Sequence, residues 1–270
     1  MLRYLSAACQ TDFPNPLSRA EIPDRVGHML GMIDRAVVGY KPFGDVRLVV
    51  FPEFAHAAPI FETVDELRDK LAVALPNEQT DRYEKKCRDH GIWVQTGSFL
   101  EVDAKYPGVV FNTTCLIGPG GLLYKYRKVH PWLPWEVHAS PHDLPGYSEP
   151  MFPVADTEIG KLGCAICYDW LFPEAIRELA LGGAEVLIRV SAYMDPGGAT
   201  SPMDSWPGGS MIVDHDGRIM SQADPGPGEK IVVGPVDVGA VRAERERRTG
   251  HCMLAHRRVE ACPLAAKPTY

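Results

Sequence analysis

The sequence predicts one mixed α/β domain, because short strand-like apolar runs alternate with amphipathic helical segments along most of the chain. By length alone, 270 residues could form one domain or two. The chain contains neither a linker-like stretch nor an internal repeat. We therefore expect a single domain over residues 1–270, with a C-terminal tail from about residue 249.

The first half of the chain establishes this alternation. A helix over residues 19–38 is predicted because apolar residues recur there at the spacing of one buried helix face. These residues are Ile22, Val26, Met29, Leu30, Ile33 and Val37. The other predicted elements are strands at 3–8 and 47–51, helices near 64–75 and 77–89, and strands at 92–99 and 109–117.

The second half continues in the same way. A Gly-Pro-Gly-Gly turn at 118–121 leads into a strand at 122–127. A strand at 160–166 precedes a helix at 173–181, which the pair Gly182-Gly183 ends. A strand at 186–190 and a hairpin over 210–220 complete the prediction. Strands that end beside helices leave a crevice in which polar side chains gather.

One polar residue of this kind is Cys167, between the apolar run 162–166 and a helix that opens near 172–174. Such a strand-to-helix turn leaves backbone N–H groups unpaired and directs the positive end of a helix dipole at the sulfur. Both effects favour the thiolate. A free cysteine is otherwise commonly a small buried hydrophobe, so a catalytic role needs a base and an orienting partner.

Two other strand ends supply candidates for those partners. Glu53 follows the run 46–51, and a carboxylate there could take a thiol proton and return it to a leaving amine. Lys128 follows the strand at 122–127, where a fixed ammonium would stabilise developing negative charge and lower the pKa of the thiol. Taken singly, a helix-capping or ion-paired glutamate and an exposed lysine are the ordinary alternatives.

Together the three segments resemble the motifs of the nitrilase, or carbon-nitrogen hydrolase, superfamily. The resemblance is carried by Phe-Pro-Glu-Phe at 51–54, Tyr-Arg-Lys-Val-His at 126–130 and Cys-Tyr-Asp-Trp-Leu-Phe-Pro-Glu at 167–174. It implies a triad in which Glu53 is the general base, Lys128 stabilises and orients, and Cys167 forms the acyl-enzyme. The backbone N–H of Tyr168 would complete the oxyanion hole.

A fourth segment, Pro-Trp-Glu at 134–136, resembles the second glutamate of the amidase-like and carbamoylase-like branches. Glu136 would then position the substrate amide. The resemblance further implies an α-β-β-α sandwich of two stacked mixed sheets flanked by helices, usually paired into homodimers or larger homo-oligomers. The expected reaction is hydrolysis of a small amide or N-carbamoyl compound through a thioester. It needs no cofactor, and nitrile hydrolysis by the same triad is the alternative.

Other patterns have competing interpretations. Cys164 and Cys167 have the spacing of a zinc or redox pair, but no second ligand pair follows, and we predict no metal site. His130, His138 and His142 fall in a proline-rich loop that we interpret as a solvated rim or a substrate-pocket wall. Trp132 and Trp135 could line a substrate pocket or pack the loop.

The sequence departs from the superfamily pattern between Val190 and Met211, where glycine and proline are frequent and helical periodicity is absent. In superfamily members a long helix and a further strand normally occupy this position. A helix-strand pair is therefore predicted to be missing, which would leave a sheet with an open edge or an uncovered face. A non-catalytic protein that binds a ligand or serves in an assembly is the second functional hypothesis.

The composition indicates which partners and which cellular compartment to expect. The formal net charge is −7 and no basic run occurs, so nucleic acid is not an expected partner. No apolar segment is long enough to cross a bilayer, and the first residues are predicted to form a strand instead of a signal peptide. Seven cysteines at scattered spacing are typical of a reducing cytoplasm.

Overall fold

A large mixed sheet forms the centre of the computed structural model, which describes residues 2–12, 15–133, 135–192, 207–247 and 256–258. Its strand order is β12-β1-β2-β4-β5-β6, with β3 paired to β4. The strands are β1 (Arg3–Gln10), β2 (Val46–Val50), β3 (Val73–Ala74), β4 (Trp93–Val102), β5 (Phe111–Gly118), β6 (Gly121–Arg127) and β12 (Lys230–Asp237). Strands β1, β2 and β4 are parallel, which the intervening helices permit.

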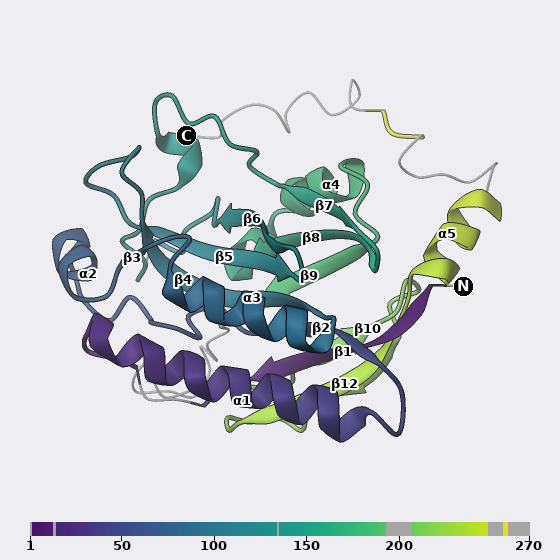
Figure 1. Cartoon of the computed structure of the whole chain (residues 1–270). Helices are drawn as coiled ribbons and strands as arrows, with labels where there is room; N and C mark the ends of the chain where they lie inside the picture. The colour runs from purple at the N-terminus through teal and green to yellow at the C-terminus, as the bar shows by residue number, and fades with distance from the viewer. Residues whose placement is uncertain (1, 13–14, 134, 193–206, 248–255, 259–270) are drawn as a thin grey trace.

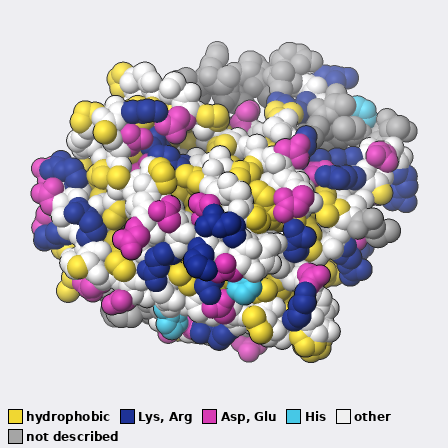
Figure 2. Space-filling view, viewed as in Figure 1, with side chains coloured by type: hydrophobic (Ala, Val, Ile, Leu, Met, Phe, Trp, Pro, Cys, Tyr) yellow, Lys and Arg dark blue, Asp and Glu magenta, His cyan; other side chains and the backbone are white. Residues whose placement is uncertain are grey.

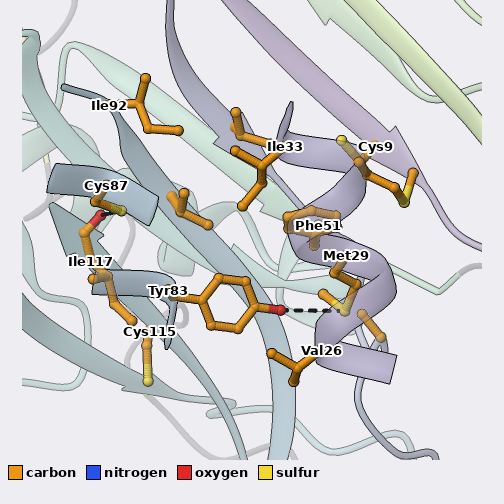
Figure 3. Close-up of a cluster of buried hydrophobic side chains, with 14 of the residues drawn as sticks. Cys9, Val26, Met29, Ile33, Phe51, Tyr83, Cys87, Ile92, Cys115 and Ile117 are labelled. Carbon is orange, nitrogen blue, oxygen red and sulfur yellow. Dashed lines mark hydrogen bonds between the residues drawn. The ribbon is translucent and has the colours of Figure 1, made fainter. Parts of the chain in front are cut away.

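Two helices cover the outer face of this sheet, α1 (Ile22–Tyr40) and α3 (Glu78–His90), as Figure 1 shows. The side chain of Asn77 accepts the first free N–H groups of α3, and Gly91 ends that helix in the left-handed conformation. Between the helices and the sheet lies a close-packed core, part of which Figure 3 draws around Phe51 and Tyr83. The Tyr83 hydroxyl donates to the sulfur of Met29 within it.

A smaller sheet packs on the other face of the large one. It consists of β7 (Val154–Thr157), β8 (Gly160–Ile166) and β9 (Val186–Val190), and α4 (Pro173–Leu181) covers its outer side. A second apolar core fills the space between the two sheets, where Leu48 and Leu116 meet Leu162 and Ile188. The layers therefore run helix, sheet, sheet, helix, which confirms the predicted α-β-β-α sandwich.

The C-terminal part returns to the large sheet. A hairpin of β10 (Met211–Val213) and β11 (Ile219–Gln222) precedes β12, which pairs antiparallel with β1 along its whole length. Helix α5 (Val238–Arg247) follows directly. On the face formed by α1 and α3, cationic and anionic side chains are interspersed (Figure 2), and ion pairs such as Lys86 with Asp34 join the two helices.

One predicted helix is shorter than its pattern indicated. The helix expected over 64–75 ends at Lys70 as α2 (Val64–Lys70), and Val73–Ala74 instead forms β3 beside β4. Leu71 leaves the helical conformation, and the N–H of Ala72 turns back to the carbonyl of Leu67. Pairing with a distant strand thus overrides the local periodicity, and β4 correspondingly extends to Val102 instead of ending near residue 99.

The region in which the sequence departs from the superfamily pattern, between Val190 and Met211, lies partly outside the described residues, because they omit 193–206. Within the described ranges, β9 pairs only with β8 and is an edge strand of the small sheet. The predicted tail from about residue 249 also lies almost entirely outside them. Among the described helices, none combines the length and the apolar character that spanning a membrane requires.

Candidate active site

Glu53 lies in a tight turn that begins where β2 ends. The residue after it, Phe54, has a φ of 57° and donates its N–H to the Ser98 hydroxyl at 2.8 Å. Gly97 on β4 allows this turn to come close, since a Cβ atom there would lie 2.5 Å from the Pro52 carbonyl oxygen. The Glu53 carboxylate is buried. Its Oε1 accepts from Asn112 at 2.8 Å, and its Oε2 accepts from the N–H of Ala192 at 3.1 Å.

Lys128 follows β6 and is fully buried. Its backbone N–H donates to the carbonyl of Asn112 at 2.8 Å, which fixes the start of its side chain. The Nζ atom lies 2.8 Å from Oε1 of Glu53, and 2.7 and 2.9 Å from the two carboxylate oxygens of Glu136. Burial alone would lower the pKa of Lys128, but the two carboxylates outweigh burial and raise it. The lysine is therefore a permanent cation.

Glu136 belongs to a turn that closes on itself. Its backbone N–H donates to the carbonyl of Trp132 at 2.9 Å, and its Oε2 accepts the backbone N–H of Trp132 at 2.5 Å. Burial and the charge of Glu53 raise the pKa of Glu136 to about 7, although Lys128 acts in the opposite direction. Glu136 can therefore exchange a proton near neutral pH.

Cys167 occupies the turn between β8 and the short 3₁₀ helix η3 (Cys167–Leu171), as predicted. Its φ of 46° is unusual for a residue with a side chain, and such strain is concentrated at functional sites. Burial and Glu53 raise the pKa of the thiol, and they outweigh Lys128, which lowers it. The predicted effect of Lys128, a lower thiol pKa, is present, but burial and Glu53 act more strongly. The sulfur lies close to the Glu53 carboxylate, which can accept its proton.

Asp169, which the sequence analysis did not select, connects the Cys167 turn to the Lys128 segment. Its carboxylate accepts the N–H of Ile166 at 2.9 Å, the hydroxyl of Tyr126 at 2.6 Å and the N–H of His130 at 2.9 Å. It is fully buried. Since Tyr126 and His130 flank Lys128 in the chain, this one carboxylate holds the two sheets in register at the site.

The residues predicted to contact substrate have protein partners as well. His130 Nδ1 lies 2.8 Å from Oδ1 of Asp169, and its ring stacks on Phe172 with centroids 4.1 Å apart. Tyr168 meets the edge of the same Phe172 ring at 5.2 Å. Trp135 packs edge-on against Phe54 at 5.7 Å. The aromatic rings thus support the turns that carry Glu53 and Cys167.

The interpretation of His138 as part of a solvated rim is wrong, whereas its place in a substrate-pocket wall stays a prediction. Its side chain is completely buried, and its Nε2 lies 3.5 Å from Oε2 of Glu136. Asn112 was also missed, although an amide within the buried strand β5 is a detectable signal. The N–H of Ala192 carries no side-chain signal, so sequence reasoning could not have found it.

A cleft with a volume of about 1240 Å³ approaches Glu53 from the side of β9. Pro52, Glu53 and Phe54 line one part of it, and Leu187, Ser191 and Ala192 line another. Its lining within the described residues includes neither Cys167 nor Lys128. Of the three predicted triad residues, Glu53 is therefore the one that this cleft reaches.

Comparison with known proteins identifies the family. The chain matches the model of the carbon-nitrogen hydrolase family over residues 6–207 and belongs to that family. Formamidases of Bacillus thuringiensis strain Al Hakam and Bacillus cereus strain B4264 are each 32% identical to it, over 193 and 194 residues. These alignments cover 70% of this chain and 54% of each formamidase. The chain thus spans about half the length of the relatives it matches.

Solved structures share the fold. Saccharomyces cerevisiae Nit3, a member of branch 10 of the nitrilase superfamily, has a TM-score of 0.73 at 22% identity, with 93% of this chain and 96% of that one covered. A carbon-nitrogen hydrolase from Helicobacter pylori G27 has a TM-score of 0.73 at 19% identity, with 99% of both chains covered. An amidase from Nesterenkonia sp. AN1, with the acetamide moiety of fluoroacetamide bound covalently to its active-site cysteine, has a TM-score of 0.67 at 19% identity and covers 96% and 95%. The predicted nitrilase-like fold is confirmed.

Proposed function

We propose that this protein is a cysteine amidohydrolase that cleaves the C–N bond of a small amide or N-carbamoyl compound. The single observation that carries the proposal is the meeting of three groups from different strand ends. The Cys167 thiol is close enough to Glu53 and Lys128 for both to shift its pKa, and the Glu53 carboxylate is hydrogen-bonded to the Lys128 ammonium at 2.8 Å. A nucleophile, a base and a fixed cation are the minimum set for acyl transfer.

In the first half-reaction, Glu53 takes the thiol proton as Sγ attacks the carbonyl carbon. The carbonyl oxygen becomes an oxyanion, which Lys128 Nζ and the backbone N–H of Tyr168 stabilise. When the C–N bond breaks, Glu53 gives the proton to the departing nitrogen. Ammonia or an amine leaves, and a thioester remains on Cys167.

In the second half-reaction, Glu53 takes a proton from water as the water oxygen attacks the thioester. The C–S bond then breaks, the proton returns to the sulfur, and the acid leaves. In the first half-reaction, before the nitrogen leaves, the carboxylate of Glu136 accepts N–H groups of the substrate amide and keeps its carbonyl toward Lys128. Trp132 and Trp135 support this turn, and His130 supports the Cys167 turn through Asp169.

The formamidase relatives favour small amides as the substrate class, because they are 32% identical over 70% of this chain. The cleft that leads toward Glu53 also supports a substrate that enters from the side of β9. A small substrate is further consistent with the burial of Glu53, Lys128 and Glu136, since little space remains around them.

The test is release of ammonia from formamide, acetamide, short N-carbamoyl compounds and short nitriles. We expect release from amides that is lost in Cys167→Ala, together with an acyl adduct on Cys167 in the intact mass. Cys164→Ala is the matched control, because Cys164 is also a free cysteine but is fully buried on β8. Release from nitriles alone would favour the nitrilase alternative. If no compound in the panel releases ammonia, the non-catalytic hypothesis would be favoured.

A further inference from the structure

His138 is a buried imidazole for which the described residues provide no hydrogen-bond partner at either ring nitrogen. Buried polar groups in proteins are nearly always paired, and the exceptions call for an explanation. Its Nε2 lies 3.5 Å from Oε2 of Glu136, which is slightly too long for a hydrogen bond. The ring is therefore adjacent to the candidate site without taking part in its hydrogen bonds.

The position of this ring is set from both sides in the chain. Before it, the Glu136 turn is closed by hydrogen bonds with the backbone of Trp132. After it, the N–H of Ala139 donates to the carbonyl of Val110 at 2.8 Å, which pins the segment beside the start of β5. With both neighbours fixed, only a small rotation of the side chain separates Nε2 from Oε2.

The charges around the ring keep it neutral. Burial and the cation of Lys128 hold the pKa of His138 well below its ordinary value. Among the charged groups that the structure describes, Glu136 also faces it, and Glu136 in turn faces Lys128, Glu53 and the Cys167 thiol. A neutral imidazole carries one N–H, which it can offer to a carboxylate without adding charge.

In the proposed reaction one carboxylate oxygen of Glu136 loses a hydrogen-bond donor, and the N–H of His138 can replace it. Lys128 donates to both oxygens of Glu136 and to Glu53, so its three N–H groups are already engaged. To stabilise an oxyanion, Lys128 must redirect one of them. The longer contact, 2.9 Å to Oε2, is the one it can release while keeping 2.7 Å to Oε1. The Oε2 atom then loses one of its two donors, Lys128 and the Trp132 N–H, while His138 Nε2 lies 3.5 Å from it.

We propose that His138 is a positioning residue for Glu136, whose Nε2–H closes onto Oε2 when an amide engages Lys128. This contact keeps the Glu136 carboxylate ionised and oriented while it accepts the substrate N–H groups. The inference rests on the proposed amidohydrolase function, because it assigns Glu136 its role from that function.

The test is the pH dependence of kcat for amide hydrolysis in His138→Phe, which removes the donor but keeps an aromatic ring. The contact forms only in the substrate complex, and kcat reports the pKa values of that complex. We expect the acid limb to move up by about one pH unit, which corresponds to a roughly tenfold change in the proton affinity of the carboxylate. His138→Gln retains an N–H donor and should return the limb toward the wild-type position. His142→Gln, in the same loop but exposed, is the matched control.

If His138 has only a structural role, the variant should lose stability and activity at every pH while the acid limb stays in place. That result would overturn the inference. A second measurement does not need turnover. In ¹⁵N-labelled Cys167→Ala, binding of formamide should shift the Nε2–H proton of His138 downfield as the hydrogen bond forms. No shift on saturation would also overturn the inference. A wild-type protein that hydrolyses no amide contradicts the proposed function first, whereas an active one with an unmoved limb contradicts only the role of His138.

Discussion

The large sheet and the small sheet contribute different chemical groups to the candidate site and hold them differently. Glu53, Lys128 and Asn112 all come from the ends or the interior of the large sheet, which has two helices on its outer face. The thiol of Cys167 comes from the small sheet, which has three described strands and an edge at β9. The acid and the cation are thus pre-assembled in one unit, and the thiol is brought to them by the other.

The two units also differ in how many contacts fix their functional group. The Lys128 ammonium has three hydrogen bonds to carboxylate oxygens, and Glu53 has three donors besides the thiol contact. The position of Cys167 depends mainly on the Asp169 carboxylate, which bridges to the Lys128 segment. We infer that damage to the large sheet alters the charges of the site, whereas damage to the small sheet alters its geometry.

The largest effect is expected from Lys128→Met, which leaves Glu53 and Glu136 buried without their cation. Loss of one partner from a buried charge cluster costs about 3–5 kcal/mol, and loss of an oxyanion donor lowers kcat by roughly 10²–10³-fold. Urea unfolding and ammonia release would measure the two effects. The control is Lys125→Met, since the partner of Lys125, Glu101, keeps two hydrogen bonds from Arg127. Equal unfolding free energies for the two variants would contradict the importance of the buried cation.

The next effect compares a glycine from each sheet. Gly97→Ala places a side chain at a φ of 74° on the large sheet, which costs about 1–2 kcal/mol before any clash. The new Cβ would also lie 2.5 Å from the Pro52 carbonyl oxygen and would push the Glu53 turn. Gly163→Ala on β8 meets the end of the flexible Leu179 side chain at 3.0 Å, so we expect about 1 kcal/mol. Thermal unfolding measures both, and a larger loss in Gly163→Ala would contradict the reasoning.

Asp169→Asn tests the connection between the sheets. An amide keeps the shape but cannot accept all four hydrogen bonds that the carboxylate accepts. Since hydrogen bonds to a charged group contribute about 1.5–3 kcal/mol, we expect a loss within that range and slower acylation of Cys167. Asp156→Asn, exposed on β7 of the same sheet, is the control. Acylation rates measured by intact mass would decide, and an unchanged rate would show that Asp169 does not position the thiol.

Much of this site could be predicted because its members follow strands with clear apolar runs. Each of Glu53, Lys128 and Cys167 stands one to three residues beyond such a run, and the structure brings them together. The layers could be predicted only through the family resemblance, since periodicity does not tell which strands pair. The shortened α2 shows the same limit, because its last residues pair with a strand that is distant in sequence.

The residues that were missed share a physical reason. Asp169 matters through partners 39 and 43 residues away, and no local pattern encodes such contacts. The position of His138 in a proline-rich loop suggested a solvated rim or a pocket wall, and the structure buries the residue. The net direction of the Cys167 pKa shift could not be predicted, since burial and a nearby carboxylate outweigh a lysine that the sequence already suggested.

The smallest expected effect is reversible: it is the protonation of Glu136, which pairs with Lys128 beside the large sheet. The pKa of Glu136 is raised to about 7, so the carboxylate is ionised above that pH and protonated below it. Because the ionised form accepts the substrate N–H groups and holds Lys128, kcat/KM should fall about tenfold per pH unit as the pH decreases below about 7. Glu136→Gln should be slower than wild type at pH 8 and should lose this acid limb, because no proton can be gained at that position. An acid limb that is unchanged in Glu136→Gln would assign the titration to Glu53 instead. The roles proposed for the two glutamates would then have to be exchanged.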